Sequence, residues 1–461
     1  MLASPFSFLS CSTNESFGRF QFWMKNSMDD KTRKNHKDTN SLINLLKNQN
    51  QTEFSMEFPL QISELPRCGL ETVRIDLFEN DHLETEVLHS KKPKDQSIPH
   101  LYFLRDDLLP LGLGSKWRKV IGILDFLKEN QMDTVLLWGA IHGNYLASFT
   151  YILRLHGIKV DTVAYSRDPR LKTYNEQLVR GHSHTIECYA SRKEAYTVWL
   201  DRQIDYSGLV LPEFGIHPGQ IPGLHSLWEK LKVEIEQNSF LLSSQKEAPN
   251  QSKDTLTKRS TNQNEIQNNQ KSIMITAILV LEVGSGATFL SAFDAFQGTS
   301  ILVLGVMVGE PKEKWIPKVA DLQKQLGLPI TSIPSEQLIT NQISAKFGKK
   351  NQILLEWIGR FYRYTNILLE PVYSGNTVNS ILREIYEQRL VGPELRDSRE
   401  SATKALDKKN TEGKNPMGEN GNSKHVQNQF LKRTPSGEMI PIFYLHQGGQ
   451  IQHLDLVLEE C

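Results

Sequence analysis

The chain of 461 residues is poor in cysteine, with Cys11, Cys68, Cys188 and Cys461 lying far apart. No two of them have the spacing of zinc ligands, and disulfide frameworks are typical of much smaller secreted chains. The sequence therefore argues against a structural zinc site and against a disulfide-stapled scaffold. We expect no bound metal, and we predict a cytoplasmic location because the sequence suits a reducing compartment.

The chain also has no excess of charge of either sign, because Lys and Arg total 53 and Asp and Glu total 53. A nucleic-acid-binding domain needs clustered basic residues, so we expect no nucleic-acid partner. Long apolar runs are missing too. The most apolar stretch, 273–283, ends in a glycine turn as a buried strand does, and it is far shorter than a membrane span. The N-terminus contains Pro5 and no basic residue before Arg19, which favours a frayed tail over a targeting segment, and we expect no membrane partner.

Apolar residues make up 39% of the chain, which is below the usual share in globular proteins. The residues responsible for this low share lie in three polar stretches, 26–53, 239–270 and 396–433. This composition is typical of solvated, weakly structured segments. We interpret residues 1–55 as an N-terminal tail without stable structure, and 239–270 and 396–433 as polar surface insertions. The remainder is long enough to bury a sizeable core.

Outside these stretches, short apolar runs alternate with segments of helical periodicity. The apolar runs predict strands at 101–104, 134–138, 160–165, 275–283 and 301–306. The helical segments are 117–128, 144–156, 287–296, 312–326, 352–364 and 377–389. Strands that alternate with helices predict an α/β fold, with parallel sheets covered by helices on both faces. Ligands of such folds bind at the carboxyl ends of the strands.

Five turns rich in glycine or polar residues fall at predicted strand ends or helix starts, and the first carries a lysine. Lys116 opens the helix after Gly114, where an amine can carry a carbonyl compound as a Schiff base. Burial or a nearby cation such as Arg118 or Lys119 would lower its pKa and favour the neutral amine. A solvated lysine at a helix start is the alternative. A P-loop does not fit, because Trp117 stands where Ser or Thr would bind magnesium.

The other turns offer hydrogen-bond donors. The backbone N–H groups and hydroxyls of Gly284-Ser285-Gly286-Ala287-Thr288 suit a phosphate, and a tight turn without a ligand is the alternative. Asn144 ends the turn at 139–144 and offers an amide to a ligand or caps a helix. Tyr373, in the turn after a predicted strand end at Glu370, is an acid, a hydrogen-bond donor or a core residue. A lysine and a phosphate site together predict a phosphorylated aldehyde, of which pyridoxal 5'-phosphate is the common one.

The order of these turns resembles that of a known family. It is similar to the pyridoxal-phosphate-dependent family of 1-aminocyclopropane-1-carboxylate deaminase and D-cysteine desulfhydrase, which has the tryptophan synthase beta-subunit fold (fold type II). The family motifs Gly-Asn-Lys-x-Arg-Lys, Gly-Gly-x-x-Ser-Asn, Pro-Val-Tyr-x-Gly-Lys and His-Thr-Gly-Gly correspond here to 114–119, 139–144, 371–376 and 446–449. The phosphate turn at 284–288 matches closely.

The resemblance implies two three-layer α/β/α domains with mostly parallel sheets. The smaller would comprise 111–206 and carry the lysine turn, and the larger, which binds the cofactor phosphate, would comprise 56–110 and 207–461. It also implies a small amino acid as substrate, a homodimer, Lys116 and Tyr373 as catalytic residues, and Lys116 as the Schiff-base lysine. The further cofactor contacts that it implies are Asn144, Gly284, Ser285, Gly286, Ala287, Thr288, Ser374 and Gln447.

Three departures from the family bear on the reaction. Gly143 replaces a serine that holds substrate, Gln447 replaces a threonine, and Ser374 stands where cyclopropane deaminases carry an acid. Ser374 favours a deaminating lyase or hydrolase like D-cysteine desulfhydrase, which yields a keto acid and ammonia by α,β-elimination. Cyclopropane deaminase activity stays open. Because of Gly143 and Gln447, so does a pyridoxal-phosphate-binding homologue with weak or no catalysis. A phosphate binder without a Schiff base is a further alternative.

Overall fold

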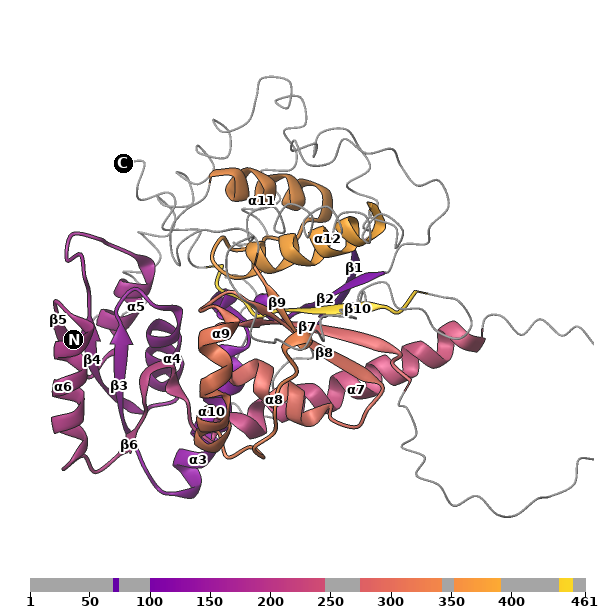
Figure 1. Ribbon diagram of the computed structural model, residues 1–461. Helices are drawn as coiled ribbons and strands as arrows, with labels where there is room; N and C mark the ends of the chain where they lie inside the picture. The colour runs from indigo at the N-terminus through magenta and orange to yellow at the C-terminus, as the bar shows by residue number, and fades with distance from the viewer. Residues whose placement is uncertain (1–68, 74–99, 245–273, 342–351, 391–438, 451–461) are drawn as a thin grey trace, which may run out of the picture.

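The computed structural model describes residues 69–73, 100–244, 274–341, 352–390 and 439–450. The predicted tail, the insertion at 396–433 and most of the insertion at 239–270 lie outside the described residues. The described part of the chain contains two sheets (Figure 1). One has six strands in the order β1-β2-β10-β7-β8-β9, and the other has four in the order β5-β4-β3-β6.

The larger sheet brings together strands that are far apart in the sequence. Its neighbours pair in parallel except β1, which is antiparallel to β2. Because β10 lies between β2 and β7, the turns that follow these three strands meet at one edge of the sheet. The strands are β1 (Gly69–Val73), β2 (Leu101–Arg105), β7 (Ala277–Val283), β8 (Ile301–Met307), β9 (Leu338–Thr340) and β10 (Ile442–His446).

Helices cover both faces of this sheet, with α7 and α8 on one face and α11 and α12 on the other (Figure 1). Side chains of β7 alternate between the two faces of the sheet, because successive residues of a strand point to opposite faces. The odd-numbered residues Leu279 and Leu281 pack on the face covered by α7. The even-numbered residues Ile278 and Val280 pack on the face covered by α12, so Glu282 lies on that face as well. The helices are α7 (Gln220–Ser244), α8 (Ala287–Ala295), α9 (Lys312–Trp315), α10 (Val319–Gln325), α11 (Gln352–Thr365) and α12 (Ser374–Leu390).

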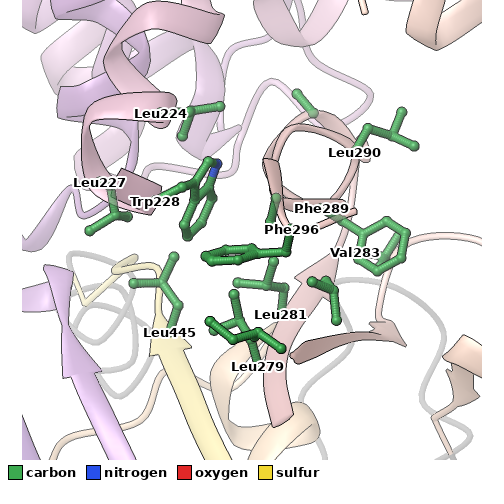
Figure 2. Close-up of a cluster of buried hydrophobic side chains, with 14 of the residues drawn as sticks. Leu224, Leu227, Trp228, Leu279, Leu281, Val283, Phe289, Leu290, Phe296 and Leu445 are labelled. Atoms are coloured by element: carbon green, nitrogen blue, oxygen red, sulfur yellow. The ribbon is translucent and has the colours of Figure 1, made fainter. Parts of the chain in front are cut away.

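Aromatic side chains fill the layer between the sheet and α7. Figure 2 shows Trp228 of α7 and Phe296, which follows α8, packed over Leu279 and Leu281 of the sheet. The rings of Trp228 and Phe296 pack edge to face with their centroids 6.1 Å apart. The indole N–H of Trp228 donates to the hydroxyl of Ser291 at 3.0 Å. Each buried side chain of this size stabilises the fold by about 2–3 kcal/mol. The layer thus fixes β7 and α8, between which the phosphate turn lies.

The smaller sheet is parallel throughout. One face packs on α3, α4 and α5, and the other on α6. Both sheets are therefore the middle layer of an α/β/α arrangement, and the predicted fold class is confirmed. The division into domains stays a prediction, and β6 lies just beyond its boundary at residue 206. The elements are β3 (Thr134–Ala140), β4 (Lys159–Tyr165), β5 (Thr185–Tyr189), β6 (Leu209–Val210), α3 (Lys116–Glu129), α4 (Asn144–Leu155), α5 (Tyr174–His182) and α6 (Arg192–Gln203).

Three sequence predictions of local structure are wrong in detail. The helix predicted at 312–326 is interrupted at 316–318, where Pro317 has no N–H to continue the helix. Within the described range 352–390, residues 366–370 form no strand before Glu370, and the imidazole of His446 donates to Leu368 O instead. Helix α7 runs to Ser244, into the insertion predicted from residue 239. No helix in the described ranges is long and apolar enough to cross a membrane.

Candidate active site

The lysine turn is bound to the end of β10. Ser115 donates from its N–H to Gln447 O at 3.2 Å and from its hydroxyl to Gln447 Oε1 at 3.3 Å. Gly114 has φ +61°, and a Cβ there would lie 1.8 Å from Gln447 O. Only glycine fits such a backbone contact. Lys116, the first residue of α3, is therefore held against the carboxyl end of the larger sheet.

Asn144 and Glu370 reach the same place from two other turns. Gly449, which follows β10, has φ +108°, and a Cβ there would lie 3.1 Å from Glu370 Cγ and 3.3 Å from Asn144 Nδ2. The N–H of Gly449 donates to Gly112 O at 2.7 Å. Four of the five predicted turns are thereby in contact around the end of β10.

The fifth turn, Gly284–Thr288, joins them through Tyr373. A Cβ on Gly284 would lie 3.5 Å from the Tyr373 ring, so this tyrosine lies beside the predicted phosphate turn. Gly286 has φ +96°, and α8 begins at the next residue. The first N–H groups of a helix have no partner within it and carry partial positive charge. The turn therefore has the geometry of an anion site.

Burial lowers the pKa of Lys116, and the carboxyls of Glu282, Glu370 and Asp106 oppose that shift. Arg118, which we expected to assist as a neighbouring cation, is instead paired with Asp106 through Nε at 2.8 Å and Nη2 at 2.5 Å. Burial and the charge of Lys116 lower the pKa of Lys119 to about 7. Two amines of reduced basicity thus lie one turn apart on α3.

Two buried carboxyls face these lysines. Burial raises the pKa of Glu282 to about 8, and the Tyr444 hydroxyl donates to its carboxylate. Burial raises the pKa of Glu370 to about 7, although the N–H groups of residues 372, 373 and 374 donate to it, those of Val372 and Ser374 at 2.7 Å. Glu282 was not among the site residues predicted from the sequence. The feature of the sequence that could have indicated Glu282 is its position as a charged residue inside an otherwise apolar strand.

The other predicted site residues lie in this region with part of their hydrogen-bonding capacity used. The hydroxyl of Ser374 accepts from Glu370 N at 2.7 Å and donates to Glu370 O at 3.3 Å. Gln447 Nε2 donates to Glu282 O at 3.3 Å. Burial raises the pKa of Tyr373, so its phenol keeps its proton near neutral pH. The assigned roles of Ser374, Gln447 and Tyr373 stay predictions.

Two buried donors in the site have no partner among the described residues. Asn144 Oδ1 accepts from Asn175 at 2.8 Å, but Asn144 Nδ2 is unpaired. The indole N–H of Trp315 is also unpaired, 3.1 Å from where a Cβ of Gly286 would be. Buried polar groups are normally hydrogen-bonded, so these donors suit a bound acceptor. No group of three metal-ligating side chains occurs in the described part of the chain.

No family model matches the chain. The D-cysteine desulfhydrase of Serratia proteamaculans (strain 568) is 22% identical over 306 residues, which cover 63% of this chain and 82% of that protein. The chain is therefore similar in sequence to a D-cysteine desulfhydrase. That of Salmonella paratyphi A is also 22% identical, over 299 residues that cover the same shares of the two chains. A solved structure described as an ACC deaminase homologue is 17% identical and has a TM-score of 0.48, covering 79% of this chain and 89% of its own.

The similarity to D-cysteine desulfhydrase supports the family that the five turns indicated, and it supports pyridoxal 5'-phosphate as the cofactor. The residues present fit this group. The turn at 284–288 offers N–H groups to a phosphate, Asn144 offers an unpaired donor, and Lys116 offers an amine of lowered pKa. These are the residues that would hold it.

Proposed function

We propose that this chain is a pyridoxal-phosphate-dependent enzyme that removes ammonia from a small amino acid by α,β-elimination, with D-cysteine as the leading substrate. The observation that carries the proposal is the meeting of Lys116, the unpaired amide of Asn144 and the turn at 284–288 at one edge of the larger sheet. The two relatives named D-cysteine desulfhydrase support the choice of substrate.

When bound, the cofactor withdraws electrons from the α-carbon of the substrate and makes its proton acidic. Because burial lowers the pKa of Lys116, more of its amine is neutral near pH 7 than in an exposed lysine. A neutral amine can attach to an aldehyde, and once released it can accept the α-proton. In their ionised forms, the carboxyls of Glu282 and Glu370 lie close enough to stabilise the ammonium that results.

In D-cysteine, loss of the α-proton lets the carbon–sulfur bond break, with its electron pair leaving on sulfur. The sulfur takes a proton and departs as hydrogen sulfide, and addition of water to the remaining dehydro amino acid gives a keto acid and ammonia. The sum is one D-cysteine and one water in, and one keto acid, one ammonia and one hydrogen sulfide out, with no oxidant. Ser374, a hydroxyl in place of an acid, favours this elimination over opening of a cyclopropane ring.

The test is to replace Lys116 with alanine and to reduce the cofactor-loaded protein with borohydride. The wild-type protein should keep the cofactor covalently on the peptide that contains Lys116, as read by mass spectrometry. The variant should lose this label, and its release of sulfide from D-cysteine should fall by about a thousandfold or more. Lys128→Ala, at an exposed position of the same helix, is the matched control. Wild-type turnover by Lys116→Ala would remove Lys116 from the reaction.

A homologue that binds the cofactor with weak or no catalysis is the second candidate. Two residues favour it. Gly143 places no side chain at the start of α4. The amide of Gln447 is already hydrogen-bonded to the hydroxyl of Ser115 and to the backbone oxygen of Glu282. Either protein would be yellow, but only an enzyme would change its visible spectrum when a substrate is added. A panel of D- and L-amino acids that includes 1-aminocyclopropane-1-carboxylate separates the candidates. The predicted homodimer and cytoplasmic location stay predictions.

A further inference from the structure

Asn175, in the first turn of α5, reaches the site from the smaller sheet. Its Nδ2 donates to His142 O at 2.9 Å and to Asn144 Oδ1 at 2.8 Å, and the residue is 1% exposed. A backbone carbonyl can only accept, so the contact with His142 fixes which end of the Asn175 amide carries the nitrogen. The partner atom on Asn144 must then be its oxygen.

This contact decides what Asn144 offers to a ligand. With its oxygen bound to Asn175, its NH2 group points away, buried and unpaired among the described residues, toward Gly449. The site therefore presents a donor at this position, and the ligand atom that meets it must be an acceptor. If the amide were turned over, an oxygen would face that acceptor, and the two would repel each other.

A second set of hydrogen bonds holds Asn175 in place. Thr173 Oγ1 accepts from Glu176 N at 3.1 Å and lies 2.9 Å from His142 Nδ1. His142 Nε2 lies 3.0 Å from Ser166 Oγ, whose hydroxyl donates to a backbone carbonyl. Ser166 therefore accepts from Nε2–H, and His142 Nδ1 accepts from Thr173. Burial lowers the pKa of His142, which agrees with this neutral form.

We propose that Asn175 is a positioning residue that fixes the polarity of the Asn144 amide, so that a donor would face an acceptor atom of bound pyridoxal 5'-phosphate. The inference rests on the proposed function, in which that cofactor occupies the site. Asn175 leaves its own Oδ1 buried without a partner among the described residues. That is unfavourable for a residue kept for packing alone, and it is accounted for if the nitrogen is what the site needs.

Asn175→Asp is the sharpest variant, because a carboxylate has nearly the same shape and can only accept. The Asn144 amide must then turn its NH2 group toward residue 175 and its oxygen toward the cofactor. We expect the dissociation constant of pyridoxal 5'-phosphate, measured by tryptophan quenching during reconstitution, to rise at least about tenfold. The pH midpoint of the visible absorbance band should also move. Asn130→Asp, an exposed residue at the end of α3, makes the same change of charge and should bind like the wild type.

Asn175→Ala frees the Asn144 amide without reversing it, so we expect a smaller loss of about threefold. It also carries the test if the aspartate variant does not fold. In an Asn144→Ala background, either change at residue 175 should weaken binding by less than about twofold, because the group that it positions is gone. Full additivity with Asn144→Ala, or wild-type affinity in Asn175→Asp, would overturn the proposal. A wild-type protein that binds no pyridoxal 5'-phosphate would instead overturn the proposed function itself.

Discussion

The two sides of the site bury different kinds of polar group. The larger-sheet side, formed by Glu282, Glu370 and Tyr444, buries carboxyls and a phenol. The smaller-sheet side, formed by His142, Asn144, Ser166, Thr173 and Asn175, is joined by amides, hydroxyls and a neutral imidazole. The first side changes its protonation near pH 7 to 8, because burial raises the pKa values of its carboxyls.

The difference separates two tasks. Buried carboxyls are costly to ionise, so the larger-sheet side holds protons near Lys116 at the pH where an amine must gain and lose one. A network of neutral donors and acceptors keeps its geometry across that range, so the smaller-sheet side can orient Asn144 whatever the charge of its neighbours. We infer that proton transfer depends on one side and ligand orientation on the other.

The largest effect is expected where the two sides meet, at Gly114. In Gly114→Ala, the new Cβ would overlap Gln447 O at 1.8 Å, and alanine would also have to adopt a left-handed backbone at φ +61°. The left-handed backbone alone costs about 1–2 kcal/mol. Displacement of the β10 end should bring the total loss in the free energy of unfolding above about 3 kcal/mol, measured by urea denaturation.

Gly157→Ala separates the two causes. Gly157 also has a left-handed backbone, at φ +79°, but nothing lies within 4 Å of the position that its Cβ would take. The free energy of unfolding of Gly157→Ala should therefore fall only by the cost of the left-handed backbone, about 1–2 kcal/mol. Equal losses for the two variants would show that the close contact between the lysine turn and β10 does not contribute, and that the two sides are not rigidly joined there.

A smaller effect, dependent on pH, is expected from Glu282→Gln in the cofactor-free protein. The folded protein keeps the proton of Glu282 up to about pH 8, whereas the unfolded chain loses it near its ordinary pKa of about 4.3. Between these values the folded state binds more protons, so this carboxyl makes stability fall as pH rises. Glutamine cannot ionise. Relative to the wild type, the variant should gain up to about 1.4 kcal/mol for each pH unit between pH 5 and pH 8.

Urea denaturation of both proteins at several pH values measures this difference. Glu229→Gln, at an exposed position of α7, is the control and should leave the pH profile of stability unchanged. A constant difference between Glu282→Gln and the wild type from pH 5 to pH 8 would contradict the comparison. It would mean that Glu282 is already ionised in the folded protein, and that the larger-sheet side does not hold its proton.

On the larger-sheet side, the backbone turns could be predicted from the sequence, whereas the charges that surround Lys116 could not. The glycines at 114 and 286 mark left-handed turns by their residue type, and strand–helix alternation indicated where the turns would gather. The proximity of Glu282 to Lys116 has no local signal, because it arises from the insertion of β10 between β2 and β7. The lowered pKa of Lys116 was anticipated from either burial or a nearby cation, and burial is the cause, since Arg118 is paired with Asp106.

The smaller-sheet side was predicted less completely. Asn144 was predicted as a site residue because it ends a motif between a strand and a helix. Asn175, 31 residues later, was not, because a single amide in the first turn of a helix is a common feature. Its role depends on the packing of α5 beside α4, which periodicity does not reveal. Helix α5 itself was not predicted, although Thr173 is a good N-cap.

The smallest predicted effect tests whether the smaller-sheet side is independent of pH. Thr173→Val keeps the shape of the side chain but removes the acceptor for Glu176 N and the donor for His142. The loss of a helix cap should cost about 1 kcal/mol of stability. Burial lowers the pKa of His142, and hydrogen bonds from Arg180 and Arg170 lower the pKa values of the nearby carboxyls of Glu176 and Asp168. None of the three changes its charge in this range, so we expect the cost to be constant from pH 6.5 to pH 9. Cofactor affinity should also fall, since Asn175 loses its support.

Ser191→Ala is the matched control, because Ser191 caps α6 through the same kind of contact, to Glu194 N at 3.1 Å, away from these turns. It should cost a similar amount of stability and leave cofactor affinity unchanged, so any loss of affinity in Thr173→Val belongs to the network around Asn144. A cost at Thr173 that changes by more than about 1 kcal/mol over this pH range would mean that a titrating group contributes to the network. The two sides would then be coupled through their charges, and the separation of proton transfer from orientation would fail.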